Sequence, residues 1–248
     1  MLKELQIWYH QGSQFIRDVR NTEVPGIFKG RPVISESKVD EAALAEVCPT
    51  QAINPGPVSI DLGRCTFCGI CAALFPEKIR FTKDYHLSAN NRNDLVIKEG
   101  MDIQVKVRNE EVRPEIRKVF RKSLKLRQVS AGGDNSAELE LNATGNVQFD
   151  IGRFGIEFVA SPRHADGLVI TGPITKNMAR ALEICYHDTP FPKVLVLCGT
   201  DAISGGIFAD SPAIDRSFLE KTHIDLYIPG NPPHPLTIIN GLLDLIGR

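Results

Sequence analysis

The sequence of 248 residues lacks any apolar run close to the about 20 residues that a membrane-spanning helix needs. Its start, MLKELQIWYHQGSQF, mixes polar and apolar side chains and has no signal-peptide core. Net charge is also scarce, because 29 Lys and Arg face 30 Asp and Glu, which argues against bulk binding of nucleic acid. These absences predict a cytoplasmic protein that reaches a membrane only at its surface or through a partner.

The usual nucleotide-binding and nucleophilic motifs are missing too. Gly132-Gly133 and Gly205-Gly206 could belong to a phosphate loop, but no Lys-Ser or Lys-Thr follows either pair, as a P-loop requires. No G-x-G-x-x-G follows a predicted strand, and no Ser–His–Asp or Cys–His pairing stands out. The sequence therefore offers no catalytic residue of its own.

What is present begins with an apolar content of 42%, enough for two modest cores. We expect a helix and an extended arm over residues 1–30, packing on the chain itself, on a partner or on a membrane interface. Residues 31–100 form a short cysteine-bearing domain, and residues 101–127 a linker with a basic amphipathic helix over 113–127, in which Ile116, Phe120 and Leu124 recur every four residues. That helix could be a solvated linker or could dock anionic lipid or a partner.

Residues 128–248 alternate apolar runs with helical patterns. We predict strands over 154–160, 167–171, 194–198 and 224–228, and helices over 176–187 and 236–246. Continuous apolar strands separated by helices indicate a parallel sheet covered on both faces. Ligands of such sheets bind among the loops at the carboxyl edge, here SPRHAD, TGPIT, CGTDAISGG and PGNPPHP. In the first of these loops, Arg163 and His164 could relay a proton or simply hold the strand end.

Four of the six cysteines have the spacing of an iron–sulfur site. CTFCGIC places Cys65, Cys68 and Cys71 in a C-x2-C-x2-C run, and Cys48, followed by Pro49, supplies a fourth thiol. Zinc usually takes two separated C-x2-C pairs, whereas three clustered cysteines and a remote Cys-Pro are typical of [4Fe–4S] ligation. We predict one [4Fe–4S] cluster on Cys48, Cys65, Cys68 and Cys71.

The matching second motif of a two-cluster ferredoxin has lost every ligand. If Cys48-Pro49 ends that motif, its own cluster needs cysteines at four other positions. These positions hold Lys38, Glu41, Leu44 and Phe75. The pattern predicts a two-cluster ferredoxin design that keeps one site.

Longer stretches of the sequence resemble two neighbouring subunits of one electron chain. PVSIDLGRCTFCGIC and FTKDYHLSANNRNDLVI are similar to the two-cluster ferredoxin subunit of complex I-like complexes. AELEL, FGIEFVASPRHADGLVITGPIT, GTDAISGGIF and YIPGNPPHPLTIINGLL resemble the small, 20 kDa-type subunit of complex I and of membrane-bound [NiFe] hydrogenases of the formate hydrogenlyase and energy-converting type. The resemblance implies an α+β ferredoxin-like domain followed by an α/β flavodoxin-like domain.

In the resembled small subunit, four cysteines bind a [4Fe–4S] cluster beside the large subunit. The corresponding positions here are Asp134, Ala137, Asp201 and Asn231. Two carboxylates, an amide and an alanine do not replace four thiolates, so we expect that cluster to be absent. A hydrated divalent cation or a partner's arginine could fill the site, although solvated or partner-paired carboxylates are the simpler interpretation. Cys185 and Cys198 are expected to be structural.

The resemblance implies an electron-transfer subunit that is not itself the catalytic site. Its partners would be the large subunit of a hydrogenase or complex I-like module, membrane subunits of that complex, and a redox donor such as ferredoxin or another iron–sulfur subunit. It would lie on the cytoplasmic face of the membrane. The alternatives are a structural or regulatory subunit of a hydrogenase-related complex without redox chemistry, and a free-standing carrier.

Overall fold

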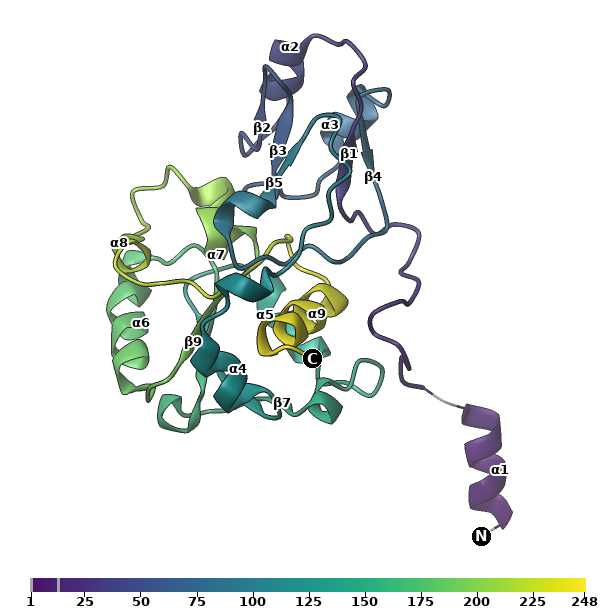
Figure 1. Ribbon diagram of the computed structural model, residues 1–248, viewed down its shortest axis with the longest axis vertical. Helices are drawn as coiled ribbons and strands as arrows, with labels where there is room; N and C mark the ends of the chain where they lie inside the picture. The colour runs from purple at the N-terminus through teal and green to yellow at the C-terminus, as the bar shows by residue number, and fades with distance from the viewer. Residues whose placement is uncertain (1, 13) are drawn as a thin grey trace.

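The computed structural model describes residues 2–12 and 14–248, which form two packed lobes and an outlying helix (Figure 1). The helix, α1 (Leu2–Gln11), has no buried residue and stands away from both lobes. The predicted helix is present and exposed, and its Trp8 and Tyr9 line a surface pocket with Asn146 and Val147 of the larger lobe. Its packing on a partner or a membrane stays a prediction. The arm after it returns to the larger lobe, where Val19 is buried and its carbonyl accepts a hydrogen bond from the Asn240 side chain.

The smaller lobe is built from short antiparallel strands and two short helices. One sheet pairs β1 with β4, and the other has the order β2-β3-β5. The first turn of α2 is capped by Asp40, whose carboxylate accepts the N–H groups of Ala42 and Ala43. The lobe has the α+β class that the sequence predicts, while its assignment as a ferredoxin domain stays a prediction. Its elements are β1 (Pro32–Ile34), α2 (Glu41–Glu46), β2 (Ile53–Asn54), β3 (Ser59–Asp61), α3 (Ile70–Leu74), β4 (Ile79–Phe81), η1 (Arg92–Leu95) and β5 (Val96–Lys98).

The larger lobe confirms the predicted parallel sheet and its flavodoxin-like α/β architecture. Five parallel strands have the order β10-β9-β8-β6-β7. Strand β7 lies on one side of β6, and β8, β9 and β10 follow on its other side, so the strand order reverses between β6 and β8. The strands are β6 (Leu124–Ser130), β7 (Ile156–Phe158), β8 (Gly167–Thr171), β9 (Val194–Cys198) and β10 (Leu226–Ile228). The helices are α4 (Pro114–Phe120), α5 (Ser136–Ala143), α6 (Lys176–Asp188), α7 (Thr200–Ser204), α8 (Ser217–Glu220) and α9 (Pro235–Ile246), with 3-10 turns η2 (Asn109–Glu111), η3 (Ile151–Phe154), η4 (Pro162–His164) and η5 (Gly206–Phe208).

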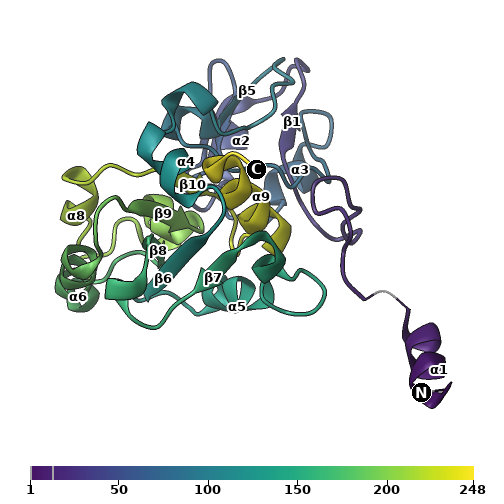
Figure 2. The same ribbon diagram turned by 60° about the horizontal axis from the view of Figure 1, so that its bottom comes forward.

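Side chains alternate between the two faces of this sheet. Leu168 and Ile170 of β8 join the core shared with the smaller lobe, whereas Val169 between them joins the core under α4, α5 and α9. Helix α9 is buried over nearly its whole length and lies across the sheet (Figure 2). No described helix is both long and apolar enough to span a bilayer.

The predicted basic helix over 113–127 is longer than the helix in the structure. Helix α4 ends at Phe120, and Leu124 opens strand β6 instead. Leu124 and Leu126 are both fully buried with exposed Lys125 between them, which is the alternation of a strand. Leu124 also continues the four-residue spacing from Ile116 and Phe120, so its local pattern fits a helix as well as a strand. The pairing of β6 with β7 and β8 determines that this segment is a strand.

Candidate functional site

The four predicted cluster cysteines line one small pocket of about 10 Å³. Cys48 follows α2, Cys65 and Cys68 lie in the loop after β3, and Cys71 is in the first turn of α3. Cys65 and Cys71 are buried and Cys68 is exposed. Cysteines that lie up to 23 positions apart in the sequence thus converge from three segments. This is the arrangement expected if the cysteine before Pro49 joins the C-x2-C-x2-C run.

The backbone around these cysteines directs N–H groups at sulfur. The N–H of Ala52 donates to Cys48 Sγ at 3.2 Å, and that of Phe67 donates to Cys65 Sγ at 3.3 Å. Phe67 holds a positive φ of 53°, which is unusual for a bulky residue and turns the chain sharply between Cys65 and Cys68. Donors aimed at sulfur stabilise thiolate charge, so this loop favours bound rather than free thiols.

Burial raises the pKa of the Cys65 thiol to about 12 and that of the Cys71 thiol to about 11, and repulsion among the four sulfurs adds to both shifts. A buried set of like charges requires a cationic group to displace its protons, and soft thiolates suit iron. No three His, Cys, Asp or Glu side chains of the described residues are arranged around a single metal ion.

Two of the positions at which we predict lost ferredoxin ligands pack as ordinary apolar side chains. Leu44 is fully buried and Phe75 packs against the same core. Beside them Lys78, only 1% exposed, donates to Glu99 Oε1 at 2.6 Å and to the carbonyl of Ser37 at 2.8 Å. The hydrogen bond from Lys78 lowers the pKa of Glu99. Apolar packing and an ion pair therefore hold this part of the lobe together.

The four positions at which we predict lost small-subunit ligands behave differently, because they line one small pocket of about 10 Å³. Asp134 follows β6, Ala137 is in the first turn of α5, Asp201 follows β9, and Asn231 follows β10. All four meet at the carboxyl edge of the sheet, next to the point where the strand order reverses. Sequence reasoning placed these residues at one site, and the structure brings them together.

Three acidic side chains meet there in different environments. The carboxylate of Asp134 accepts the N–H of Ser136 at 2.9 Å and its hydroxyl at 2.6 Å, which lowers the pKa of Asp134. Glu138 is buried and accepts the hydroxyls of Ser130 and Thr171, both at 2.6 Å. Asp201 is buried, and its Oδ1 has no hydrogen-bond partner among the described residues. Burial raises the pKa of Asp201 to about 6, and the negative charge of Asp134 adds to the shift.

Two other candidates lie differently from expectation. Cys198, predicted as structural, is fully buried but also lines this second cavity, and burial raises the pKa of its thiol. Cys185 is half-buried on α6 and lines neither cysteine-bearing cavity. Arg163 and His164 are exposed in η4 and are not among the residues that line this second pocket.

The two sites are connected through helix α7, which sequence reasoning missed. The buried hydroxyl of Thr200 donates to the carbonyl of Cys65 at 2.8 Å across the lobes, while the adjacent Asp201 lines the second cavity. A Cβ at Gly63 would lie 2.7 Å from the Ile203 side chain, so this helix touches the cysteine loop closely. No local pattern marks a hydrogen bond between residues 135 positions apart.

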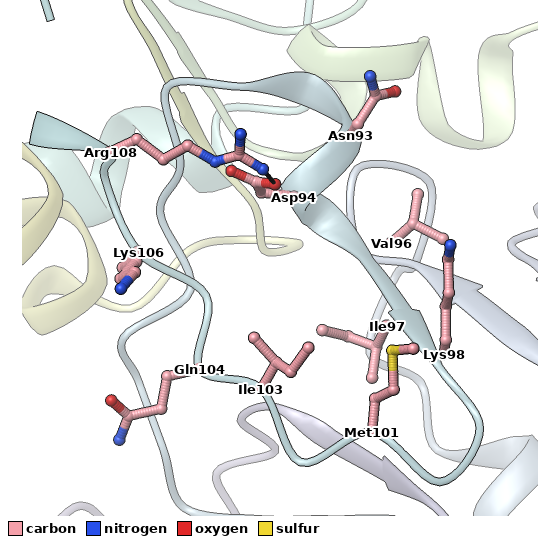
Figure 3. A pocket seen from close by; sticks show the side chains of 10 residues that line it. All are labelled: Asn93, Asp94, Val96, Ile97, Lys98, Met101, Ile103, Gln104, Lys106 and Arg108. Carbon is pink, nitrogen blue, oxygen red and sulfur yellow. Dashed lines mark hydrogen bonds and ion pairs between the residues drawn. The ribbon is translucent and has the colours of Figure 1, made fainter. Parts of the chain in front are cut away.

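A third pocket lies along β5 and the segment after it (Figure 3). Its only ion pair among the labelled side chains joins Arg108 to Asp94, and its one sulfur is the thioether of Met101. This pocket has no thiol and no free acid–base pair among its lining residues, so it is a weaker candidate for the functional site than the pocket of the four cysteines. Its lining residues are Asn93, Asp94, Val96, Ile97, Lys98, Met101, Ile103, Gln104, Lys106 and Arg108.

Residues 135–245, nearly the whole of the larger lobe after β6, match the family model of the NADH ubiquinone oxidoreductase 20 kDa subunit. A probable membrane-bound hydrogenase subunit, mbhJ, from Pyrococcus furiosus is 34% identical over 115 residues, covering 46% of this chain and 69% of that protein. The chain belongs to this 20 kDa subunit family. An NADH-quinone oxidoreductase subunit from Citrifermentans bemidjiense is 43% identical over 107 residues, which cover 43% of this chain and 62% of that protein.

Two solved structures show a limited likeness to this 20 kDa family member. A chain of the membrane-bound sulfane sulfur reductase, an archaeal respiratory membrane complex, aligns at 28% identity and a TM-score of 0.47, covering 54% of this chain and 75% of that one. A chain of an NAD+-reducing [NiFe]-hydrogenase aligns at 20% identity and a TM-score of 0.39, covering 51% and 93%.

If the second cavity is an emptied cluster site, cysteines should refill it. A variant that carries Asp134→Cys, Ala137→Cys, Asp201→Cys and Asn231→Cys should bind a second [4Fe–4S] cluster and raise iron from about four to about eight per chain. Iron and acid-labile sulfide analysis after anaerobic reconstitution measures this. A variant with a native melting temperature and still only about four irons would contradict this interpretation of the cavity.

Asp201 should make stability depend on pH. Because its folded pKa of about 6 lies above the ordinary value of 3.8, its contribution is full below about pH 4 and is lost as pH rises through 6. In EDTA, Asp201→Asn should therefore be more stable than wild type by on the order of 2 kcal/mol at pH 7.5 and by much less at pH 4. Urea unfolding at both pH values measures the difference, and exposed Asp210→Asn is the matched control. An equal effect at both pH values would refute it.

Proposed function

We propose that this chain is an iron–sulfur electron-transfer subunit of a membrane-bound complex I-like or hydrogenase-like oxidoreductase. It carries one [4Fe–4S] cluster on Cys48, Cys65, Cys68 and Cys71. Its larger lobe docks a large subunit without supplying the cluster that such lobes usually hold. The observation that carries the proposal is the meeting of these four thiols in one cavity with backbone N–H groups aimed at their sulfurs.

The residues around the cavity define how the site works. A bound cluster supplies one-electron transfer. The four thiolates hold it, and apolar neighbours such as Ile53, Ile60 and Phe81 keep water away. The N–H groups of Ala52 and Phe67 favour the more negative, reduced charge state through their bonds to sulfur. Exposed Cys68 marks the side on which a redox partner approaches closest.

Membership of the 20 kDa family supports partners of the same kind. The relatives are a membrane-bound hydrogenase subunit and NADH-quinone oxidoreductase subunits. We therefore propose a large subunit of a hydrogenase or complex I-like module, membrane subunits of the same complex, and a donor such as ferredoxin or another iron–sulfur subunit as partners. The chain would then lie on the cytoplasmic face of the membrane, held there by the complex.

One observation favours a rival function. The second cavity has kept its place in the sheet but holds carboxylates where thiolates would continue the electron path. A structural or regulatory subunit in a hydrogenase-related complex without redox chemistry would show the same loss. Nickel-ligating cysteine pairs in the partner large subunit would favour electron transfer, and their absence would favour the rival.

The decisive test is the iron and sulfide content of anaerobically purified protein, with an EPR spectrum after reduction. We expect about four irons per chain and one cubane signal. Cys65→Ser should abolish the native signal, whereas Cys185→Ser, half-buried on α6, should retain it. Protein without a reversible iron–sulfur signal would overturn the proposal, and a monodisperse monomer that never joins a complex would indicate a free carrier.

Thr200 should act as a positioning residue for the cluster loop. Thr200→Val leaves the buried carbonyl of Cys65 without its donor, which costs ~1–3 kcal/mol of folding free energy. We expect an altered EPR line shape and a shifted midpoint potential, and Thr200→Ser should restore both. If Thr200→Val lowered the melting temperature without changing the spectrum or the potential, the residue would be structural only.

A further inference from the structure

Strand β5 is an edge strand, and its outer side has no partner. Among the described strands it pairs with β3 alone. The N–H of Glu99 donates to the carbonyl of Val58 at 2.9 Å. Because hydrogen bonding alternates along an antiparallel pair, the main-chain groups of Val96 and Lys98 point away from β3. Neighbouring turns bind the N–H of Val96 and the carbonyl of Lys98, which leaves the other group of each residue unpaired among the described residues.

A second run of main-chain groups without partners lies beside this edge. From Asp102 to Val107, no main-chain N–H or carbonyl forms a hydrogen bond with another described residue. Val105 and Val107 are buried, whereas Gln104 and Lys106 are exposed, which is the alternation of an extended chain. Main-chain polar groups beside buried side chains are nearly always paired in folded proteins. The segment 102–107 therefore carries free donors and acceptors, as the edge of a sheet does.

These two unpaired segments lie on either side of the pocket of about 380 Å³ in Figure 3. The side chains of Ile97, Met101 and Ile103 point into the space between them. Met101 is 48% exposed and Ile103 is 63% exposed, although both side chains are apolar. The volume of this pocket lies within the range of protein binding sites. The space thus combines an apolar floor with unpaired main-chain groups on two sides.

The free charges at this pocket are positive. Asp94 is the acidic residue in the lining, and it is paired with Arg108. Arg108 also binds Glu111 at 2.8 Å, so its own charge is offset. Lys98 and Lys106 are exposed and have no ion pair among the described residues. An occupant that carries carboxylates is therefore complementary in charge.

We propose that this pocket docks an extended, acidic segment of a partner protein, which adds a strand to the edge of β5. The main chain of that segment would bind the Val96 carbonyl and the Lys98 N–H. One of its apolar side chains would enter between Ile97 and Ile103, and its carboxylates would meet Lys98 and Lys106. The pocket shares no lining residue with the pocket of the four cysteines, so the proposal does not depend on the cluster.

The test replaces Ile103 with the photo-crosslinking amino acid benzoylphenylalanine in the full chain, expressed with its native partners. After irradiation of the purified complex, mass spectrometry should find one crosslinked partner segment that contains at least two Asp or Glu residues. Lys98→Glu combined with Lys106→Glu should lower the crosslink yield by ~10-fold or more. Lys98→Arg combined with Lys106→Arg should keep the yield. Lys221→Glu, which reverses an exposed charge outside the pocket, should also keep it.

Hydrogen exchange tests the added strand directly. Amides within residues 96–98 and 102–107 should exchange ~10-fold or more slowly in the complex than in the isolated chain. The charge-reversal variant should keep a native melting temperature, because both lysines are exposed. No crosslink, a crosslink to a second copy of this chain or to a segment without acidic residues, or unchanged exchange on assembly would each overturn the proposal. A charge-reversal variant with an undiminished crosslink yield would overturn it as well.

Discussion

The structure depends on the contact between helix α7 and the cysteine loop. Thr200 donates across the lobes to Cys65, and Ala202 and Ile203 join a core that also contains Leu62 and Cys65. The two lobes are further joined where Ala89 pairs with Tyr227 of β10. A small lobe with strands of two or three residues has little core of its own, so the sheet edge provides much of its support.

The two sets of positions at which we predict lost cluster ligands differ in how the surrounding chain packs. In the smaller lobe, Leu44 and Phe75 pack into the core beside the Lys78–Glu99 ion pair, so the position is filled. At the sheet edge, loops with close glycine contacts enclose the space, and a Cβ at Gly172 would lie 2.4 Å from the backbone nitrogen of Gly133. Such tightly packed loops cannot move inward, and the cavity persists with carboxylates on its wall.

These two outcomes bear on function in opposite ways. Packed side chains at the predicted ferredoxin positions leave no room there for a metal group. The small pocket at the carboxyl end of the parallel sheet is lined by oxygen donors, which do not suit an iron–sulfur cluster. Helix α7 contacts Cys65 through Thr200 and lines this cavity with Asp201. The carboxylate of Asp201 therefore lies one residue from a direct contact with the cysteine loop.

The sequence by itself determined the cysteine quartet, the sheet strands 167–171 and 194–198, and the helices near 176–188 and 235–246. Motif spacing and runs of apolar residues are local properties, so they can be read without a fold. Tertiary structure alone decided that Leu124 begins a strand, because its spacing suits a helix equally well. It also decided the Thr200–Cys65 bond, the burial of Lys78 and the unpartnered oxygen of Asp201, since each depends on contacts between residues far apart in the chain.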